Sequence, residues 1–76
     1  MSERLPRVTA ADTIKAIQKI GFSFSRQSGS HKIYKNDKGN RVTVPIHSGK
    51  ILLPKTLVSI LRDAELSVEK FRELLK

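Results

Sequence analysis

One short run of the sequence combines residue types that could cleave a phosphodiester bond. His31 lies in the run from Gly29 to Lys35, which reads GSHKIYK. Histidine exchanges a proton near neutral pH, so it could remove the 2′-hydroxyl proton of RNA and let that oxygen attack the adjacent phosphorus. Such a reaction needs no protein-bound cofactor, only cations to stabilise the charge that builds on the phosphate oxygens. The candidate cations near this histidine are Lys32, Lys35, Arg41 and Lys50.

Other residues around this run could contact RNA. Gly29 and Ser30 could present backbone N–H groups to a phosphate. His47, in a glycine-containing loop, could contact RNA, give a proton to the leaving oxygen, or be an ordinary exposed residue. Tyr34 could stack on an unpaired base or pack in the core. His31 itself has an alternative interpretation as a polar residue at the start of a strand.

The charge distribution favours a polyanionic partner. Fifteen Lys and Arg against seven Asp and Glu give a net charge of +8 on 76 residues. The excess is concentrated between Arg26 and Lys55, where Asp37 is the only acidic residue. A small domain with this charge favours fast, salt-sensitive association with nucleic acid. A membrane surface fits less well, because no basic amphipathic helix carries the charge.

Length and composition exclude several kinds of fold and site. A chain of 76 residues makes a single domain, residues 1–76, with a compact core. It has no cysteine, so a disulfide framework and a thiolate metal site are excluded. Two histidines sixteen residues apart make a poor zinc site, and we expect neither metal nor cofactor. No apolar run approaches a membrane span and the first residues lack a signal-peptide core, so a cytoplasmic protein is expected.

The first half of the chain predicts one helix and two strands. After a lead-in over residues 1–8, Thr9 and Asp12 have the spacing of a capping box that opens a helix, and Gly21 ends it. Alternating residues predict strands over 22–25 and 31–35, separated by a break over 27–30.

The second half predicts a third strand and two helices. Turn-forming residues at 36–40 predict a hairpin loop, and a strand over 41–44 should end at Pro45. After a loop over 47–50, Pro54 suits the first position of a helix that ends near Asp63. Ser67 caps a last short helix, with Leu66 and Phe71 spaced as a hydrophobic staple.

The order α-β-β-β-α-α predicts an α+β fold. The connections between strands are too short for a parallel crossover, so the sheet is a three-stranded antiparallel meander with helices packed on one face. Which face His31 occupies stays open. If Ile33 points into the core, alternation places His31 on that side and Lys32 and Tyr34 on the open side.

Three runs together resemble the HicA family of messenger-RNA-cleaving toxins. They are Gly29-Ser30-His31-Lys32-Ile33-Tyr34-Lys35, Val44-Pro45-Ile46-His47, and the run from Leu53 to Leu61, and the likeness extends from about Asp12 to Phe71. The resemblance implies a fold similar to a double-stranded-RNA-binding domain and a catalytic role for His31. This chain departs from many members at Lys55, where they have glycine, which places a cation at a helix start that the helix dipole disfavours.

Three functions remain open. The first is a metal-independent endoribonuclease toxin that cleaves mRNA with His31 as general acid and base. It would be a monomer when free and silenced by a HicB-like antitoxin, as the resemblance implies. The second is a non-catalytic RNA-binding module, and the third is a protein-interaction domain with an acidic partner. The fold alone does not separate them, because one scaffold can host binding and cleavage.

Overall fold

The computed structural model describes residues 4–47 and 49–76. Its elements follow the predicted order: α1 (Ala10–Gln18), β1 (Ser23–Ser28), β2 (His31–Lys35), β3 (Arg41–Pro45), α2 (Pro54–Asp63) and α3 (Val68–Leu74). The strands form one antiparallel sheet in the order β1-β2-β3. The predicted α+β fold with a three-stranded meander is therefore confirmed. Residues 1–3 of the predicted lead-in and Ser48 of the predicted loop lie outside the described residues.

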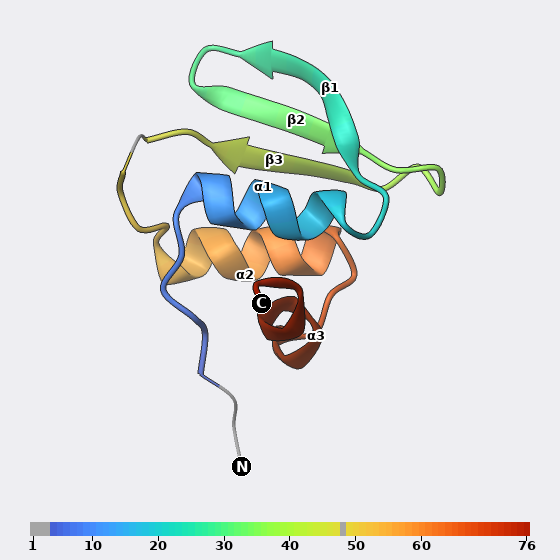
Figure 1. The fold of residues 1–76 in the computed structure, drawn as a ribbon. Coiled ribbons are helices and arrows are strands. Elements are labelled where there is room, and N and C mark those ends of the chain that lie inside the picture. The colour runs from blue at the N-terminus through green and yellow to red at the C-terminus, as the bar shows by residue number, and fades with distance from the viewer. Residues whose placement is uncertain (1–3, 48) are drawn as a thin grey trace.

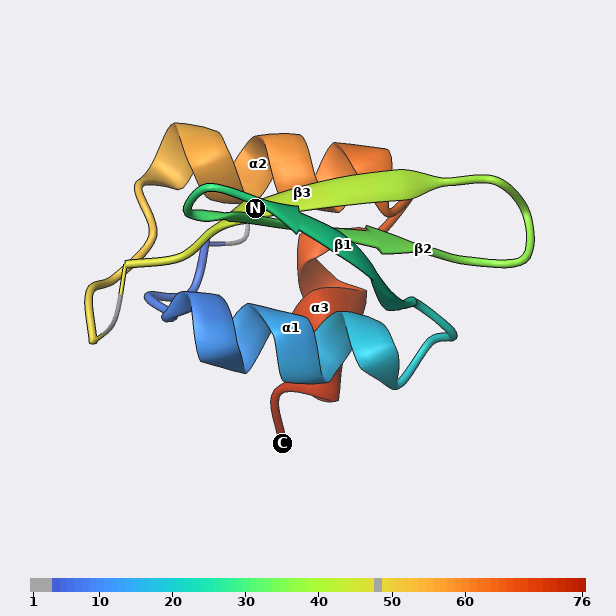
Figure 2. The same ribbon diagram turned by 90° about the horizontal axis from the view of Figure 1, so that it is seen from above.

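The helices lie together along one side of the sheet. In Figure 1, α1 and α2 run beneath β3, with α3 below them, and Figure 2 shows α3 between the two longer helices. Both α1 and α2 contact β3, and α1 contacts α3. The core between these layers is aliphatic apart from Phe22, Tyr34 and Phe71. Through this core, the central strand β2 and the neighbouring β3 pack against the helices.

Capping side chains set two of the helix starts. Thr9 Oγ1 accepts from Asp12 N at 3.2 Å, and Asp12 Oδ2 accepts from Thr9 N at 3.1 Å, which is the predicted capping box. Ser67 Oγ accepts from Lys70 N at 3.0 Å at the start of α3. In contrast, α2 begins after Leu53 with no side-chain cap and with a proline as its first residue.

The capping box of α1 is expected to stabilise the fold. Replacing Thr9 with alanine removes the acceptor for the Asp12 N–H group, and the expected loss is about 1 kcal/mol in the free energy of unfolding. Urea denaturation followed by circular dichroism checks this. Thr9→Ser keeps the hydroxyl and should lose much less; an equal loss in both variants would show that the methyl group, not the cap, matters.

Three details differ from the sequence prediction. Strand β1 is longer than expected, running through Ser28, because a bulge between Phe24 and Arg26 lets it keep pairing with β2. Strand β3 includes Pro45. The lead-in is packed near the helices, since Val8 is buried and its carbonyl accepts from Leu52 N at 2.8 Å.

Candidate active site

Strand register decides which face His31 occupies. Tyr34 lies opposite Val42 and Lys32 opposite Val44, and both valines are fully buried in the core between sheet and helices. The alternating positions of β2, which are His31, Ile33 and Lys35, therefore lie on the opposite face, here called the outer face. Ile33 does not join the core cluster, so the core residue of this strand is Tyr34. His31 does share a face with Ile33, but that face is turned away from the core.

A groove lies at the edge strand β3, where the outer face of the sheet meets the neighbouring helix α2. It has a volume of about 370 Å³ and is lined by His31, Thr43 and Pro45 from the sheet and by Lys55, Thr56, Ser59 and Ile60 from α2. The His31 side chain is exposed, and among the described residues Lys55 is the one Lys or Arg that lines the groove. Three hydroxyl groups complete the polar lining. A base, a cation and hydroxyl donors thus meet in one solvent-open groove.

The start of α2 adds a further positive element to this groove. No side chain caps its first turn, and Pro54 has no N–H group. The N–H groups of Lys55 and Thr56 come next in the chain, and both residues line the groove. Uncapped N–H groups and the helix dipole at an N-terminus attract anions. Lys55 adds a full positive charge at the same place.

The turn before His31 is tied to the far end of β3. Gly29 has a φ of +57°, a conformation that glycine adopts without strain. Gln27 Nε2 donates to the Gly29 carbonyl at 2.9 Å, and Ile46 N donates to the Ser30 carbonyl at 2.6 Å. These bonds use the carbonyl groups of the turn and fix the backbone on which His31 sits.

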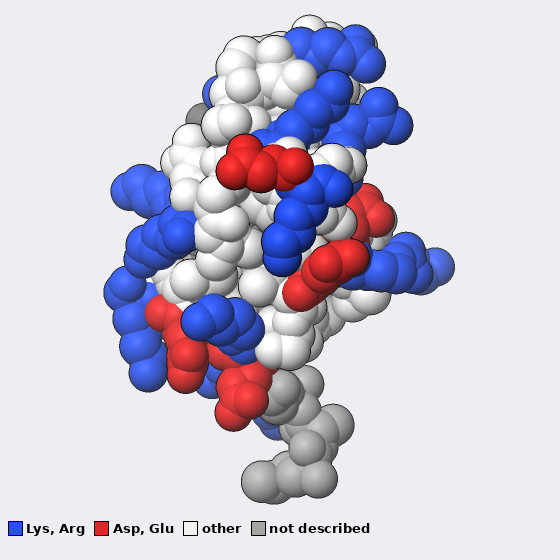
Figure 3. All heavy atoms as spheres, turned by 90° about the vertical axis from the view of Figure 1, so that its right-hand side faces the viewer, with Lys and Arg blue, Asp and Glu red and all other residues white. Residues whose placement is uncertain are grey.

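The outer face also carries several cations, and the sequence analysis had named some of them as candidates near His31. Lys35 and Arg41, two of the predicted cations, are cross-strand partners there, and both are exposed. Arg26, opposite Ile33, joins them because of the bulge in β1, whereas Lys55 lines the groove at the other end of the sheet, with His31 and Pro45. Sequence reasoning missed these last two. Figure 3 shows Lys and Arg side chains gathered at the upper right, over the strands, with acidic and basic groups mixed lower down.

Other predicted site residues lie elsewhere. Lys32 is half-buried on the helix-facing side and shares a second groove with His47, lined also by residues of α1. Lys50 is exposed in the loop before α2. The structure therefore does not bring Lys32 or His47 together with His31, and we leave them out of the candidate active site.

Tyr34 is packed rather than presented. It is 4% exposed and belongs to the core cluster, and the Phe24 ring meets it edge-on with centroids 5.8 Å apart. A base cannot stack on a covered ring, so a stacking role for Tyr34 is not retained. The exposed aromatic of this pair is Phe24, at 54%.

Burial raises the pKa of the Tyr34 phenol above its ordinary value of 10.0. Above about pH 10 the unfolded chain ionises its tyrosine first and so binds fewer protons than the folded chain. The free energy of unfolding should therefore fall as pH rises through this range. Denaturation curves between pH 9 and about pH 11 check this, with Tyr34→Phe expected to fall less steeply. Identical slopes in both proteins would contradict the assignment.

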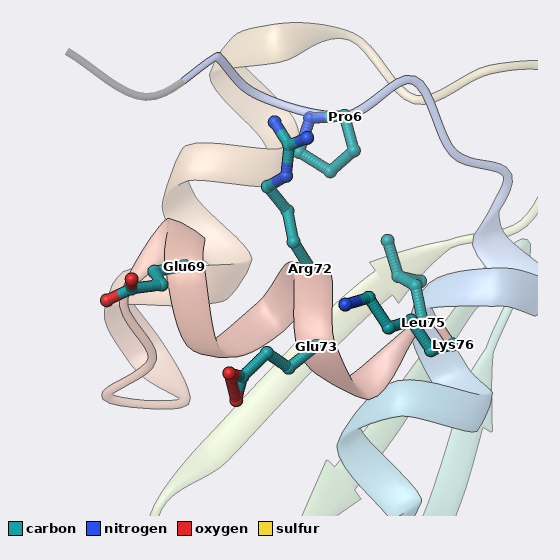
Figure 4. Close-up of a pocket in the computed structure, with 6 residues that line it drawn as sticks. All are labelled: Pro6, Glu69, Arg72, Glu73, Leu75 and Lys76. Atoms are coloured by element: carbon teal, nitrogen blue, oxygen red, sulfur yellow. The ribbon is translucent and has the colours of Figure 1, made fainter. Parts of the chain in front are cut away.

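A larger hollow than the His31 groove lies elsewhere on the molecule. It has a volume of about 490 Å³ and lies beside α3, lined by Pro6, Glu69, Arg72, Glu73, Leu75 and Lys76. Figure 4 shows the Arg72 side chain reaching toward Pro6, and its Nη1 donates to the Arg4 carbonyl at 3.2 Å. This hollow lies where the N-terminal segment packs against α3. Arg72 holds the N-terminal segment against α3.

In residues 4–47 and 49–76 no three His, Cys, Asp or Glu side chains gather where they could hold a metal ion. Within the same residues, no helix is both long enough and apolar enough to cross a membrane.

Comparison with known families identifies the chain. No curated protein matches it. The family model described as the HicA toxin of bacterial toxin-antitoxin matches residues 10–66, which include the whole sheet, the His31 turn and α2. A family of this kind implies a cognate antitoxin as partner. The match spans most of the 76 residues, and the chain belongs to the HicA toxin family.

Proposed function

We propose that this toxin is an endoribonuclease that cleaves mRNA at the His31 groove. The observation that carries the proposal is the meeting of an exposed His31 with Lys55 and the uncapped start of α2 in one groove. A histidine supplies the base, and the positive end of α2 attracts the phosphate. Membership of the HicA toxin family supports the same activity.

The proposed reaction is an internal transfer of the phosphoryl group. His31 takes the proton from the 2′-hydroxyl, and the 2′-oxygen forms a bond to the adjacent phosphorus. The bond from phosphorus to the 5′-oxygen breaks, and the protonated His31 gives its proton to that oxygen, directly or through a water, which returns the imidazole to its neutral form. The products are a 2′,3′-cyclic phosphate and a free 5′-hydroxyl. Lys55 and the N–H groups of α2 would stabilise the charge on the non-bridging oxygens in the transition state.

Cleavage of a defined mRNA by the purified protein tests the proposal. We expect cleavage in excess EDTA, fragments that carry a 5′-hydroxyl, and no cleavage when the 2′-hydroxyls are replaced by 2′-O-methyl groups. Intact RNA under all conditions, with binding retained, would instead favour a non-catalytic RNA-binding module. Fragments with a 5′-phosphate would exclude the internal transfer.

We further propose that the antitoxin is HicB-like and covers the His31 groove with an acidic surface. Three of the exposed large hydrophobic residues, Ile51, Leu53 and Val58, lie in or just before the first half of α2, and Leu53 is 71% exposed. Apolar contacts there would slow dissociation, while opposite charge would speed the encounter. A structure of the complex tests this. An antitoxin bound only to α1 and α3, with His31 open to solvent, would exclude direct occlusion.

A further inference from the structure

The bulge in β1 has a consequence for the outer face. In an unbroken strand, residues two apart share a face, so Arg26 would lie on the side of Phe24, facing the helices. The register instead pairs Phe24 with Tyr34 and Arg26 with Ile33, leaving Ser25 as the extra residue. Arg26 therefore lies on the outer face with Ile33, and Gln27 takes the helix-facing position opposite Lys32.

The pairings place Arg26 between two other features of this face. One row across the sheet is Ser23, Lys35 and Arg41, the next is Arg26, Ile33 and Thr43, and the last is Ser28, His31 and Pro45. Rows of this kind are two residues apart, or about 6.6 Å along the strand. Arg26 thus stands one row from His31 and one row from the Lys35–Arg41 pair.

We infer that one RNA strand lies across the outer face, and that Arg26 binds a phosphate neighbouring the one at which His31 acts. The inference rests on the proposed function. The phosphates of this strand would follow a path from the Lys35–Arg41 row, past Arg26, to the groove that His31 and Lys55 line together. All four cations are exposed, so each can reach a phosphate without being desolvated first.

The same face predicts how RNA is recognised. None of the nine positions in the three rows is Phe, Tyr or Trp, and His31 carries the one aromatic ring among them. Single-stranded RNA is commonly read by bases stacking on aromatic side chains, and this face offers no Phe, Tyr or Trp for that purpose. Contacts to phosphates carry no direct sequence information. Arg26 is therefore a positioning residue whose loss should weaken binding equally for RNAs of different sequence.

Two variants distinguish the effect of where the Arg26 charge lies from the effect of its being present at all. Arg26→Gln removes the guanidinium, and the double variant Arg26→Gln/Gln27→Arg moves it to the helix-facing side without changing composition. Both positions are exposed, so both proteins should fold. Lys70→Gln is the matched control, since it removes one exposed charge from α3. Binding is measured with 2′-O-methyl RNAs of two sequences, which cannot be cleaved, and cleavage with the corresponding unmodified RNAs.

Arg26→Gln and the double variant should both raise KM and lower the slope of log Kd against log salt by about 0.7. Arg26→Gln should leave kcat within about twofold, whereas the double variant also loses the bond from Gln27 to the Gly29 carbonyl and is compared by KM and salt slope alone. The ratio of the variant's Kd to the wild type's Kd should then fall by about 2.5-fold between 50 and 200 mM salt. Lys70→Gln should match the wild type. If the wild type cleaves RNA but both Arg26 variants behave like Lys70→Gln, the inference is wrong and the proposed function stands. A wild type that neither binds nor cleaves RNA overturns both.

Discussion

Replacing His31 with alanine is expected to slow RNA cleavage by about 10²- to 10⁴-fold, the usual contribution of a general acid or base. The side chain is exposed and lies at the first position of β2, so its removal leaves no cavity in the core. The variant should therefore keep the thermal midpoint of the wild type. Single-turnover cleavage with saturating protein measures the rate, and Kd for 2′-O-methyl RNA should change little.

The second histidine provides the control for this prediction. His47 is exposed and lines the groove on the other side of the sheet, so His47→Ala should cleave RNA within about twofold of the wild type. Growth of cells that express each variant gives an independent test: His31→Ala should be harmless where His47→Ala is toxic. Equal toxicity of wild type and His31→Ala would remove His31 from the mechanism.

Replacing Phe71 with alanine is expected to destabilise the protein by about 3 to 5 kcal/mol. Phe71 is fully buried, and it is the largest such side chain in the core. A chain of this length has a stability of about 4 to 11 kcal/mol in total. Much of the protein should therefore be unfolded at 37 °C. Urea denaturation followed by circular dichroism gives the value, and Lys70→Ala on the exposed side of α3 should change it by less than about 0.5 kcal/mol.

The Phe71 variant also tests where the folded unit ends. The family match stops at residue 66, yet α3 begins at Val68 and supplies Phe71 to the core. Lys19 at the end of α1 reinforces this packing, because its Nζ donates to the Leu74 carbonyl at 2.7 Å and to the Lys76 carbonyl at 3.1 Å. If Phe71→Ala unfolds like the wild type, α3 is an accessory and the core is complete without it.

The elements that sequence predicted best are those set by neighbours in the chain. The capping box at Thr9 and Asp12, the proline that opens α2 and the cap at Ser67 all act within one helical turn. Their geometry depends on backbone N–H groups three residues away, not on the rest of the fold. The positions of these helices could therefore be predicted without knowing what they pack against.

The candidate site depended on contacts that local patterns do not contain. Ile33 and Tyr34 are both apolar enough to face the core, and only the pairing with Val42 and Val44 selects Tyr34. The bulge at Ser25 has no glycine or proline to mark it, so the face of Arg26 could not be predicted. Lys55 meets His31 only because α2 lies beside β3, although the two residues are 24 positions apart.

Because α2 has no side-chain cap, the N–H groups of its first turn are available to a phosphate, but the helix lacks the stability that a cap would add. A serine or aspartate in place of Leu53 could accept from the N–H groups of the first turn, and such caps stabilise a protein by about 1 kcal/mol. The same oxygen would then occupy the donors that a phosphate needs, and an aspartate would also repel it. A substitution that makes this toxin more stable is thus expected to slow the proposed RNA cleavage, a trade-off common at functional sites.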